Sequence, residues 1–314
     1  MATKYGTDKT TILKYARSIG YDTNANHPPV LTEEQKEFVK TNYNNFTSTE
    51  LSKRLNVSRS TILKVWMDSG LIGKVGRIYQ YNENYFESID SPNKAYWLGF
   101  LASDGCIAHH DKDNRQDSIR LNLQSCDCEI LEKLNKELKT TKPIVYYTRK
   151  SDGGKYVGVE FSSNKMSSDL QKYNLGYRKT YDYIFPDMIE EKYYRDFIRG
   201  FFDGDGCISH SFDINTLYKV NVSISGFFKN LSRIQEILAQ NGIEAVFTED
   251  KREYGDCKDK FGALTFRNKK EKMKFLQYIY FPSELHLERK YSLAKKFIEL
   301  VPQSKAGWTT KKER

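Results

Sequence analysis

The chain has 314 residues, of which 39% are apolar and 14% aromatic, and this aromatic content excludes a wholly disordered protein. Lys and Arg number 50 against 41 acidic residues, so the formal net charge is +9 and nucleic acid is the simplest partner. No stretch approaches the roughly 20 apolar residues of a membrane helix, and the N-terminus lacks an apolar signal core. We therefore expect a cytoplasmic protein with no membrane partner. The five Cys residues form no CxxC pair, which argues against disulfides and a zinc site.

Residues 1–75 are expected to form a small all-α module. Three helices are predicted, over about 33–41, 47–55 and 59–68, because Thr or Ser caps precede runs with helical periodicity. Apolar residues at matching positions would give these helices one shared core. They are Leu51, Leu55, Val57, Ile62 and Trp66.

The last two of these helices resemble a helix-turn-helix, whose second helix meets base edges in the major groove of DNA. The polar residues that would face DNA are Arg59, Ser60, Thr61 and Lys64. The alternative is an ordinary three-helix cap with a polar outer face. Upstream, Thr10–Gly20 echoes Ser60–Gly70, which predicts a second helix of the recognition type without supporting helices. The polar stretch 76–90 is expected to be a linker.

The rest of the chain is an internal duplication. Each copy opens with an apolar helix that ends in Asp-Gly-Cys-Ile, at 94–107 and at 196–208. A strand pair that includes an alternating strand, a helix, a second strand pair and another helix follow in both copies, so the predicted order is αββαββα twice. We expect an α+β fold with a first half at 91–187, a second half at 188–303 and a basic tail at 304–314.

The strand that follows each motif alternates strictly between apolar and polar residues. Ile119–Gln124 aligns with Tyr218–Ser223, and both have a basic–apolar–Asn centre. Period two places the polar residues on one sheet face, which is free to meet DNA because the apolar face must cover helices. The candidate contacts are Arg120, Asn122, Gln124, Lys219, Asn221 and Ser223, joined on the outer strands by Tyr146, Tyr147, Arg149, Lys251 and Arg252. Any one of them can instead be an ordinary solvated residue.

Two acidic residues, Asp104 and Asp205, end the motif helices at equivalent positions. Small residues one helical turn apart would let the helices pack backbone to backbone, which brings the two carboxylates together. Negative charge is disfavoured at helix C-termini and between like charges, so a bound cation is expected, and oxygen ligands favour Mg²⁺ or Mn²⁺. The alternative is that Asp-Gly only ends each helix in a turn. The small residues are Gly99 with Ser103 and Gly200 with Gly204.

Residues 97–105 and 198–206 resemble the two signature helices of LAGLIDADG homing endonucleases. The resemblance covers about residues 86–300. It implies the homing-endonuclease fold in a monomer with two pseudo-symmetric halves, whose motif helices meet at the interface and whose sheets form a saddle on double-stranded DNA. Ala102 departs from the family motif, which has Asp at that position.

The same resemblance implies the residues of the active site. Asp104 and Asp205 would be catalytic metal ligands, with Gly105 and Gly206 beside them at the metal. The family places a basic residue near each metal centre, and the repeated Arg-Lys tags offer the catalytic candidates Lys179 and Lys290. The alternative for these lysines is a basic helix start that faces solvent or phosphate.

The sequence therefore predicts a site-specific, metal-dependent double-strand DNA endonuclease, lengthened by a helix-turn-helix. Each Asp would serve one strand by holding a metal that activates water for in-line attack on phosphorus. One alternative is a non-cleaving DNA-binding transcriptional regulator on this fold. Another is an RNA maturase that binds intron RNA and helps it splice. The chain carries no G-x-x-x-x-G-K-[ST] loop, so ATP-driven chemistry is not expected.

Overall fold

The computed structural model describes residues 8–20, 31–43, 45–71, 79–109, 116–177, 179, 183–211, 219–250 and 259–300. The chain divides into two compact units, Met1–Tyr79 and Gln80–Arg314. No helix in these described ranges is long and apolar enough to cross a membrane.

The first unit is helical, as the caps and periodicity predict. Thr47 and Glu50 form a capping box at one helix, and Ser58 caps the next. The indole nitrogen of Trp66 donates to the carbonyl oxygen of Val39 at 3.0 Å, which ties the last helix to an earlier one. Four of the five predicted core residues are buried, and Leu55 packs against them half-buried. The helices are α2 (Lys9–Ser18), α3 (Glu33–Thr41), α4 (Ser48–Leu55) and α5 (Arg59–Asp68).

The second unit confirms the duplicated αββαββα order. The first half consists of α6 (Pro92–Asp104), β1 (Gly105–Ala108), β2 (Ser118–Gln124), α7 (Cys128–Glu137), β3 (Val145–Thr148), β4 (Lys155–Ser162) and α8 (Asn164–Gln171). The second half consists of α10 (Tyr194–Asp205), β5 (Gly206–Ser211), β6 (Lys219–Phe227), α11 (Phe228–Gln240), β7 (Val246–Glu249), β8 (Phe261–Thr265) and α12 (Lys269–Tyr280). A further helix, α13 (Glu288–Leu300), closes this half.

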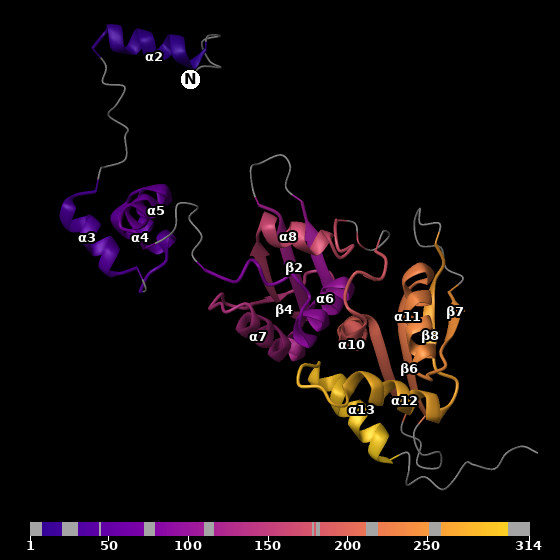
Figure 1. Ribbon diagram of the computed structural model, residues 1–314. Helices are drawn as coiled ribbons and strands as arrows, with labels where there is room; N and C mark the ends of the chain where they lie inside the picture. Colours follow the sequence, from indigo (N-terminus) through magenta and orange to yellow (C-terminus); the bar gives the residue numbers. More distant parts are fainter. Residues whose placement is uncertain are drawn as a thin grey trace, which may run out of the picture. The chain divides into compact units, whose positions relative to one another are not determined.

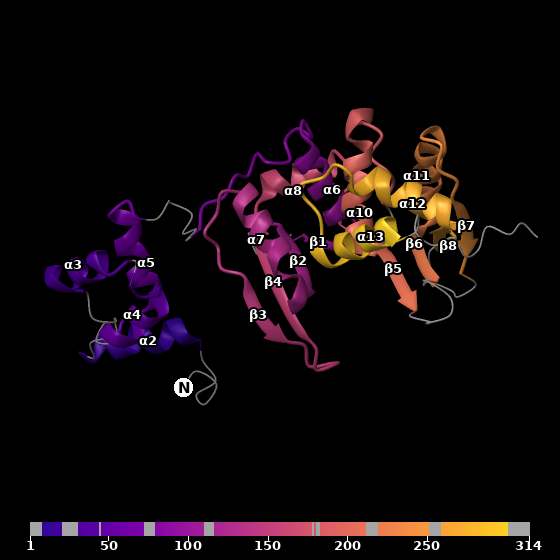
Figure 2. The ribbon, with the colours of Figure 1, turned by 90° about the horizontal axis from the view of Figure 1, so that it is seen from below.

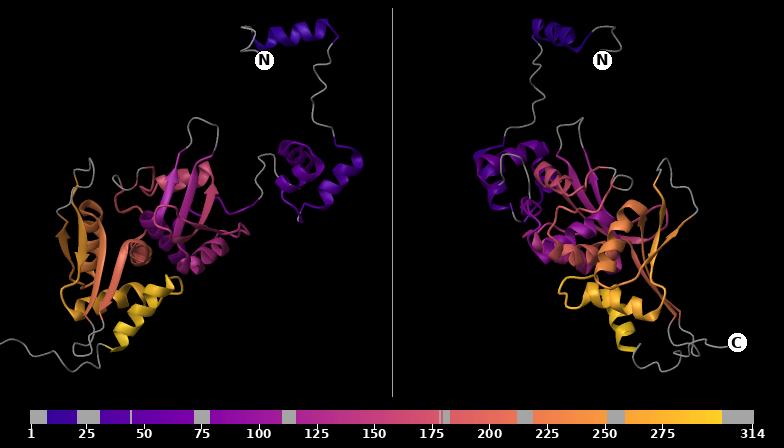
Figure 3. Two further views of the ribbon diagram at one scale, coloured as in Figure 1. Left: turned by 180° about the vertical axis from the view of Figure 1, so that it is seen from behind. Right: turned by 45° about the vertical axis from the view of Figure 1, so that its right-hand side comes forward.

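Each half builds one four-stranded antiparallel sheet with the same strand order. The orders are β1-β2-β4-β3 and β5-β6-β8-β7. In Figures 1 and 2, α6 and α10 lie between the two sheets, and α12 and α13 lie together at one end of the second unit. The views in Figure 3 show α11 against the second sheet, where it contacts β6, β7 and β8.

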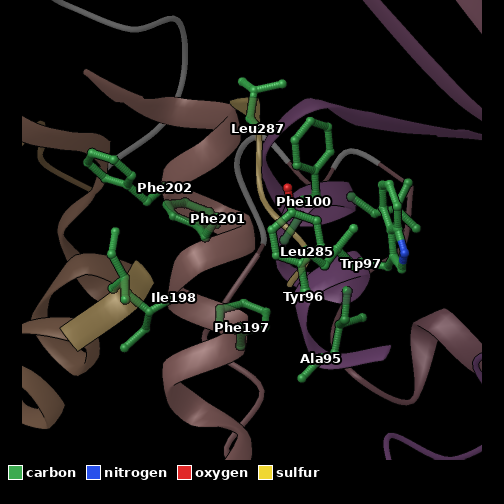
Figure 4. Close-up of a cluster of buried hydrophobic side chains, with 14 of the residues drawn as sticks. Ala95, Tyr96, Trp97, Phe100, Phe197, Ile198, Phe201, Phe202, Leu285 and Leu287 are labelled. Atoms are coloured by element: carbon green, nitrogen blue, oxygen red, sulfur yellow. The ribbon is translucent and has the colours of Figure 1, made fainter. Parts of the chain in front are cut away.

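The motif helices α6 and α10 pack backbone to backbone, as the small residues predict. A Cβ atom on Gly99 would lie 2.1 Å from the carbonyl oxygen of Phe197, and one on Gly200 would lie 1.9 Å from that of Tyr96. Both distances are far below van der Waals contact, so only glycine fits at either crossing point. Figure 4 shows the apolar side chains around this contact, among them Tyr96, Phe100, Phe197, Phe201, Leu285 and Leu287.

The predicted linker 76–90 is wrong in its described part. Tyr85, Phe86 and Ile89 are buried in the main core. The hydroxyl of Tyr81 donates to the carbonyl oxygen of Ser162 at 2.7 Å, and that of Tyr85 donates to Glu137 at 2.9 Å. The polar composition of this segment concealed three apolar anchors, so the second unit begins at Gln80.

Candidate active site and nucleic-acid interface

Asp104 and Asp205 are the last residues of α6 and α10, and the chain passes from each helix directly into a strand. Gly105 and Gly206 cap the helices with extended backbones, so the Asp-Gly pairs do not form turns. A Cβ atom on Gly105 would lie 2.5 Å from the carbonyl oxygen of Leu101, so space requires glycine there. Each carboxylate therefore stands at the junction of a motif helix and a sheet.

The two carboxylates influence one another. Partial desolvation raises the pKa of Asp205 to about 6, and the negative charge of Asp104 contributes to the rise. The pKa of Asp104 is raised by desolvation as well, while Lys290 and Lys179 oppose the shift. Both side chains keep solvent-exposed surface. Two accessible carboxyl groups whose pKa values are raised side by side are stabilised in their charged form by a cation, so the pair suits cation binding.

Each lysine of the repeated tags caps the C-terminus of one motif helix. The Lys179 ammonium donates to three carbonyl oxygens of α6, those of Leu101 (3.0 Å), Ala102 (2.8 Å) and Ser103. The Lys290 ammonium donates to four carbonyl oxygens at the end of α10, those of Phe202 (2.8 Å), Asp203 (2.8 Å), Gly204 (3.2 Å) and Gly206. Terminal carbonyls lack helical partners, and a cation there also offsets the helix dipole.

Burial lowers the pKa of both Lys179 and Lys290 to about 8, although the neighbouring carboxylates act in the opposite direction. Lys290 is only 3% exposed, so the alternative of a solvent-facing helix start is wrong for this residue. The two lysines place positive charge at the C-terminal ends of α6 and α10, where the carboxylates stand.

A buried carboxylate that the sequence analysis did not single out organises the second half. Asp203 is 1% exposed and accepts hydrogen bonds from the hydroxyls of Tyr96 (2.8 Å) and Tyr280 (2.5 Å) and from the backbone N–H of Leu287 (2.8 Å). Ala102 holds the equivalent position in the first half, so the difference between the two motifs was the available signal.

The residues present fit a hard divalent cation. Two oxygen-donor carboxylates converge at the ends of α6 and α10, and substrate phosphate oxygens can complete a coordination shell. Among the described residues, no group of three or more His, Cys, Asp or Glu side chains forms a preorganised metal cage. The site is therefore partly open and shared by the two halves. Such a site is typical of Mg²⁺ or Mn²⁺ and unlike the closed cage of a structural metal.

The polar face of the first sheet follows the predicted alternation. Asn122 and Gln124 are exposed, and Arg120 is half-buried. Glu160 lies opposite Arg120 in the strand pairing, and its carboxylate is 3.0 Å from the guanidinium. Arg120 is therefore paired with Glu160 when no DNA is bound.

The strand register corrects the expectation for Tyr146 but not that for Tyr147. Tyr146 pairs with Val157 and reaches the sulfur of Cys128 on α7 at 2.8 Å, so it lies on the helix-covered face rather than the polar one. Tyr147 lies on the polar face, where its ring stacks on that of Tyr156 at 5.9 Å.

The equivalence of Arg120 and Lys219 is also wrong. Cys106 pairs with Arg120, whereas the matching Cys207 pairs with Ser223. Ser223 is therefore the counterpart of Arg120, because the β5–β6 hairpin is longer than β1–β2 and shifts the alignment.

The second sheet has a different polar face from the first. Its strands place described polar side chains there that are uncharged and mostly small hydroxyls, namely Ser209, Asn221, Ser223, Ser225, Thr248 and Thr265. Arg149 of the first half is exposed and stacks over Tyr156, 3.7 Å from its ring centre. Lys251, Arg252 and the side chain of Lys219 lie outside the described residues.

In the first unit, the predicted contact residues lie on the early turns of α5. Arg59, Ser60 and Lys64 are exposed, and Thr61 is half-buried. The Arg59 Nε donates to the hydroxyl of Ser48 at 2.9 Å, which fixes the guanidinium against α4.

Residues 192–280 match the family model of the LAGLIDADG-like domain. This range runs from the start of α10 to the end of α12 and contains Asp205. No curated protein matches the chain.

The chain is also similar to solved structures. One is the homing endonuclease I-WcaI bound to its DNA recognition sequence, with 14% identity, a TM-score of 0.48, and coverage of 71% of this chain and 96% of that one. Another is the LAGLIDADG homing endonuclease I-LtrWI bound to target DNA, with 12% identity, a TM-score of 0.44, and coverage of 71% and 92%. A third is I-DmoI in complex with DNA and Mn, with 18% identity, a TM-score of 0.39, and coverage of 65% and 100%.

Proposed function

We propose that the protein is a site-specific, divalent-metal-dependent double-strand DNA endonuclease that acts as a monomer. The observation that carries the proposal is the pair of carboxylates, Asp104 and Asp205, at the ends of two helices in backbone contact. Two acids at equivalent positions of a duplicated unit suit a substrate with two equivalent strands. The LAGLIDADG-like match of residues 192–280 supports the same class of activity.

In this proposal Asp104 and Asp205 hold Mg²⁺ or Mn²⁺, one carboxylate serving each strand. The bound metal supplies Lewis acidity and a more acidic water at the scissile phosphate. Lys179 and Lys290 keep the ends of α6 and α10 positively charged, so that two carboxylates and a phosphate can gather there. Gly105 and Gly206 let each strand leave the helix without covering the carboxylates.

The polar faces of the two sheets are the proposed DNA-binding surface. Arg120 suits guanine, and Asn122 and Gln124 suit adenine, through paired hydrogen bonds in the major groove. Arg149 and Tyr147 extend the surface of the first sheet, and Asn221 and Ser223 form part of that of the second. Lys219, Lys251 and Arg252 remain proposed contacts on the sequence pattern alone.

The helical unit 1–75 is proposed to lengthen the recognised site through Arg59, Ser60, Thr61 and Lys64. A truncation that tests this role should begin at Gln80, because Tyr85 and Phe86 belong to the core of the second unit. The truncated chain should still cleave, with a shorter footprint on one side and a shallower salt dependence of affinity. The slope of log affinity against log salt concentration should fall in magnitude by about 0.9 for each phosphate contact removed. An unchanged footprint would favour a helical cap instead.

The experiment that tests the function is incubation of a randomised duplex library with the full chain and Mg²⁺ or Mn²⁺, followed by sequencing of the cut ends. A defined cut site is expected. Asp104→Asn and Asp205→Asn should each abolish double-strand cleavage while leaving DNA affinity roughly unchanged, since affinity comes mainly from phosphate contacts. Binding without cleavage by the unmodified chain would favour a regulator, and selective binding of folded intron RNA would favour a maturase.

A further inference from the structure

Helix α13 belongs to the second half, yet its first turn is bound to the first half. The Arg289 Nε donates to both carboxylate oxygens of Asp127, at 2.9 and 3.0 Å. Asp127 directly precedes α7, and its side chain is 6% exposed, whereas that of Arg289 is 53% exposed. A buried carboxylate is strongly destabilising without a partner, so the pair fixes the start of α13 against α7.

The residue after Arg289 is Lys290, whose ammonium donates to the carbonyl oxygen of Gly204 at 3.2 Å. A Cβ atom on Gly204 would lie 3.2 Å from the Oδ2 atom of Asp104. Gly204 therefore binds the lysine of the second half through its carbonyl oxygen, and its backbone lies near the carboxylate of the first half. A Cβ atom at this position would lie 1.9 Å from the Oγ atom of Ser103, so the glycine is what lets the ends of α6 and α10 approach.

The charges follow the same crossed pattern. Lys290 is the cation that most strongly lowers the pKa of Asp104, ahead of Lys179. Conversely, Asp205 acts on the pKa of Lys179 more strongly than Asp104 does. Each lysine is thus anchored on the motif helix of its own half, and its charge acts on the carboxylate of the other half.

We propose that the Asp127–Arg289 ion pair is a clamp between the halves that positions Lys290 beside Asp104. Arg289 is a positioning residue: it acts through Lys290 rather than on the substrate. Loosening the clamp should disturb the carboxylate of the first half while leaving Lys179 and its surroundings in place. The inference rests on the proposed function only where strand cleavage is measured.

The first test needs no DNA. The full chain is acetylated with limiting acetic anhydride, and the rate at each lysine is read by mass spectrometry. Lys290 should react slowly in the unmodified chain, and Arg289→Gln or Asp127→Asn should raise its rate at least about fivefold, while the rate at Lys179 changes by less than about twofold. Arg289→Lys, which keeps the charge, should partly restore protection.

Arg233→Gln is the matched control, because Arg233 forms a partly exposed ion pair with Asp187 at 2.7 Å. It should leave Lys290 protected. Should Asp127→Asn unfold the chain, Lys179 would react as well, and the half-exposed Arg289 would then decide the question. Unchanged protection of Lys290 in a folded Arg289→Gln variant would overturn the clamp.

The second test uses a duplex recovered from the library, with the two strands labelled separately. Arg289→Gln should slow the cut that Asp104→Asn blocks by about tenfold and change the other cut by less than about twofold. Equal slowing of both cuts, or slowing of the cut that Asp205→Asn blocks, would contradict the crossed arrangement. If the unmodified chain cuts no duplex, the proposed function fails, while the acetylation experiment still decides whether the clamp exists.

Discussion

The two halves of the second unit share one order of elements but hold their lysines by different means. In the second half, two buried residues of α10 bind the last turn of α12 and the segment between α12 and α13. Arg199 donates to the carbonyl oxygens of Leu285 (2.9 Å) and Ile279 (3.2 Å), and Asp203 accepts from the N–H of Leu287. Lys290 lies in the first turn of α13, which follows this segment.

In the first half, Leu98 and Ala102 occupy the equivalent positions on α6 and offer no such bonds. The chain before Lys179 is held near the surface instead. Asp117, at the start of β2, accepts from the hydroxyl of Tyr177 at 2.6 Å and lies 2.7 Å from the ring nitrogen of His109. One half therefore relies on polar groups that are all buried, whereas in the other the buried Asp117 is paired with His109, which water can reach. Substitutions should accordingly damage the fold more in the second half than in the first.

The glycine crossing is the feature that both halves share, and it gives the largest expected effect. Gly200→Leu and Gly99→Leu should each destabilise the fold by more than about 3 kcal/mol or prevent folding, because a Cβ atom alone would collide with the facing backbone. Gly176→Leu is the control, since the nearest atom there is 3.6 Å away. Chemical denaturation measures the difference. A Gly200→Leu variant as stable as the control would show that the helices do not meet at this point.

Next in size is the contrast between the two anchoring carboxylates. Asp203→Ala leaves two buried tyrosine hydroxyls and one N–H unpaired and should cost about 3–5 kcal/mol. Asp117→Ala should cost only about 1–2 kcal/mol, because water can reach His109 when the carboxylate is removed. Urea unfolding of both variants tests the comparison. Equal losses would mean that the two halves are anchored with similar strength.

The fold was largely predictable because its signals are local. Capping residues, strand alternation and the duplicated Asp-Gly-Cys-Ile motif predicted the helices and strands of both halves. The close packing of α6 and α10 followed from the positions of small residues, since a one-turn spacing places them on one helix face. The core contacts of 80–90 were missed, because the apolar residues there are few and depend on partners distant in the sequence. Helix α13 entered only as the alternative of a basic helix start at Lys290, although its apolar residues recur at helical spacing.

The candidate site was only partly predictable. The positions of Asp104 and Asp205 follow from the motifs, but the partners of Lys179 and Lys290 are more than 70 residues away in the sequence. Pairing across strands is equally invisible in one sequence, and so the proximity of Glu160 to Arg120 was not foreseen. Ser223, and not Lys219, is the counterpart of Arg120 because the second hairpin is longer. Matching the two strand sequences by their residue pattern does not reveal this difference.

A smaller effect on stability is expected at Asp205 in the absence of divalent metal. The pKa of Asp205 is about 6 in the folded chain against an ordinary 3.8, so the folded state binds this proton more tightly and loses stability as pH rises from about 4 to 6. Asp205→Asn should therefore stabilise the chain by about 1 kcal/mol at pH 7.5, discounted because the side chain is exposed, and by nothing below pH 4. Thermal unfolding across pH measures the gain. Equal stability at pH 7.5 would contradict the raised pKa.

The smallest expected effect concerns the two sheet faces. Glu160 neutralises Arg120 on the first sheet, whereas Thr265 faces Ser223 at the equivalent place on the second. Glu160→Gln removes one negative charge and releases Arg120, so binding to duplex DNA of random sequence should tighten a few-fold, and the salt slope should steepen by up to about 0.9.

Thr265→Val is the control for that substitution, because it changes the matching position of the second sheet without changing charge. It should leave the salt slope as it is. Fluorescence anisotropy at several salt concentrations measures both variants. On the selected target the result can differ in sign: a carboxylate can accept a hydrogen bond from the amino group of cytosine, so Glu160→Gln would weaken that complex if Glu160 reads such a base. An unchanged slope and affinity on both duplexes would exclude this part of the first sheet from the DNA interface.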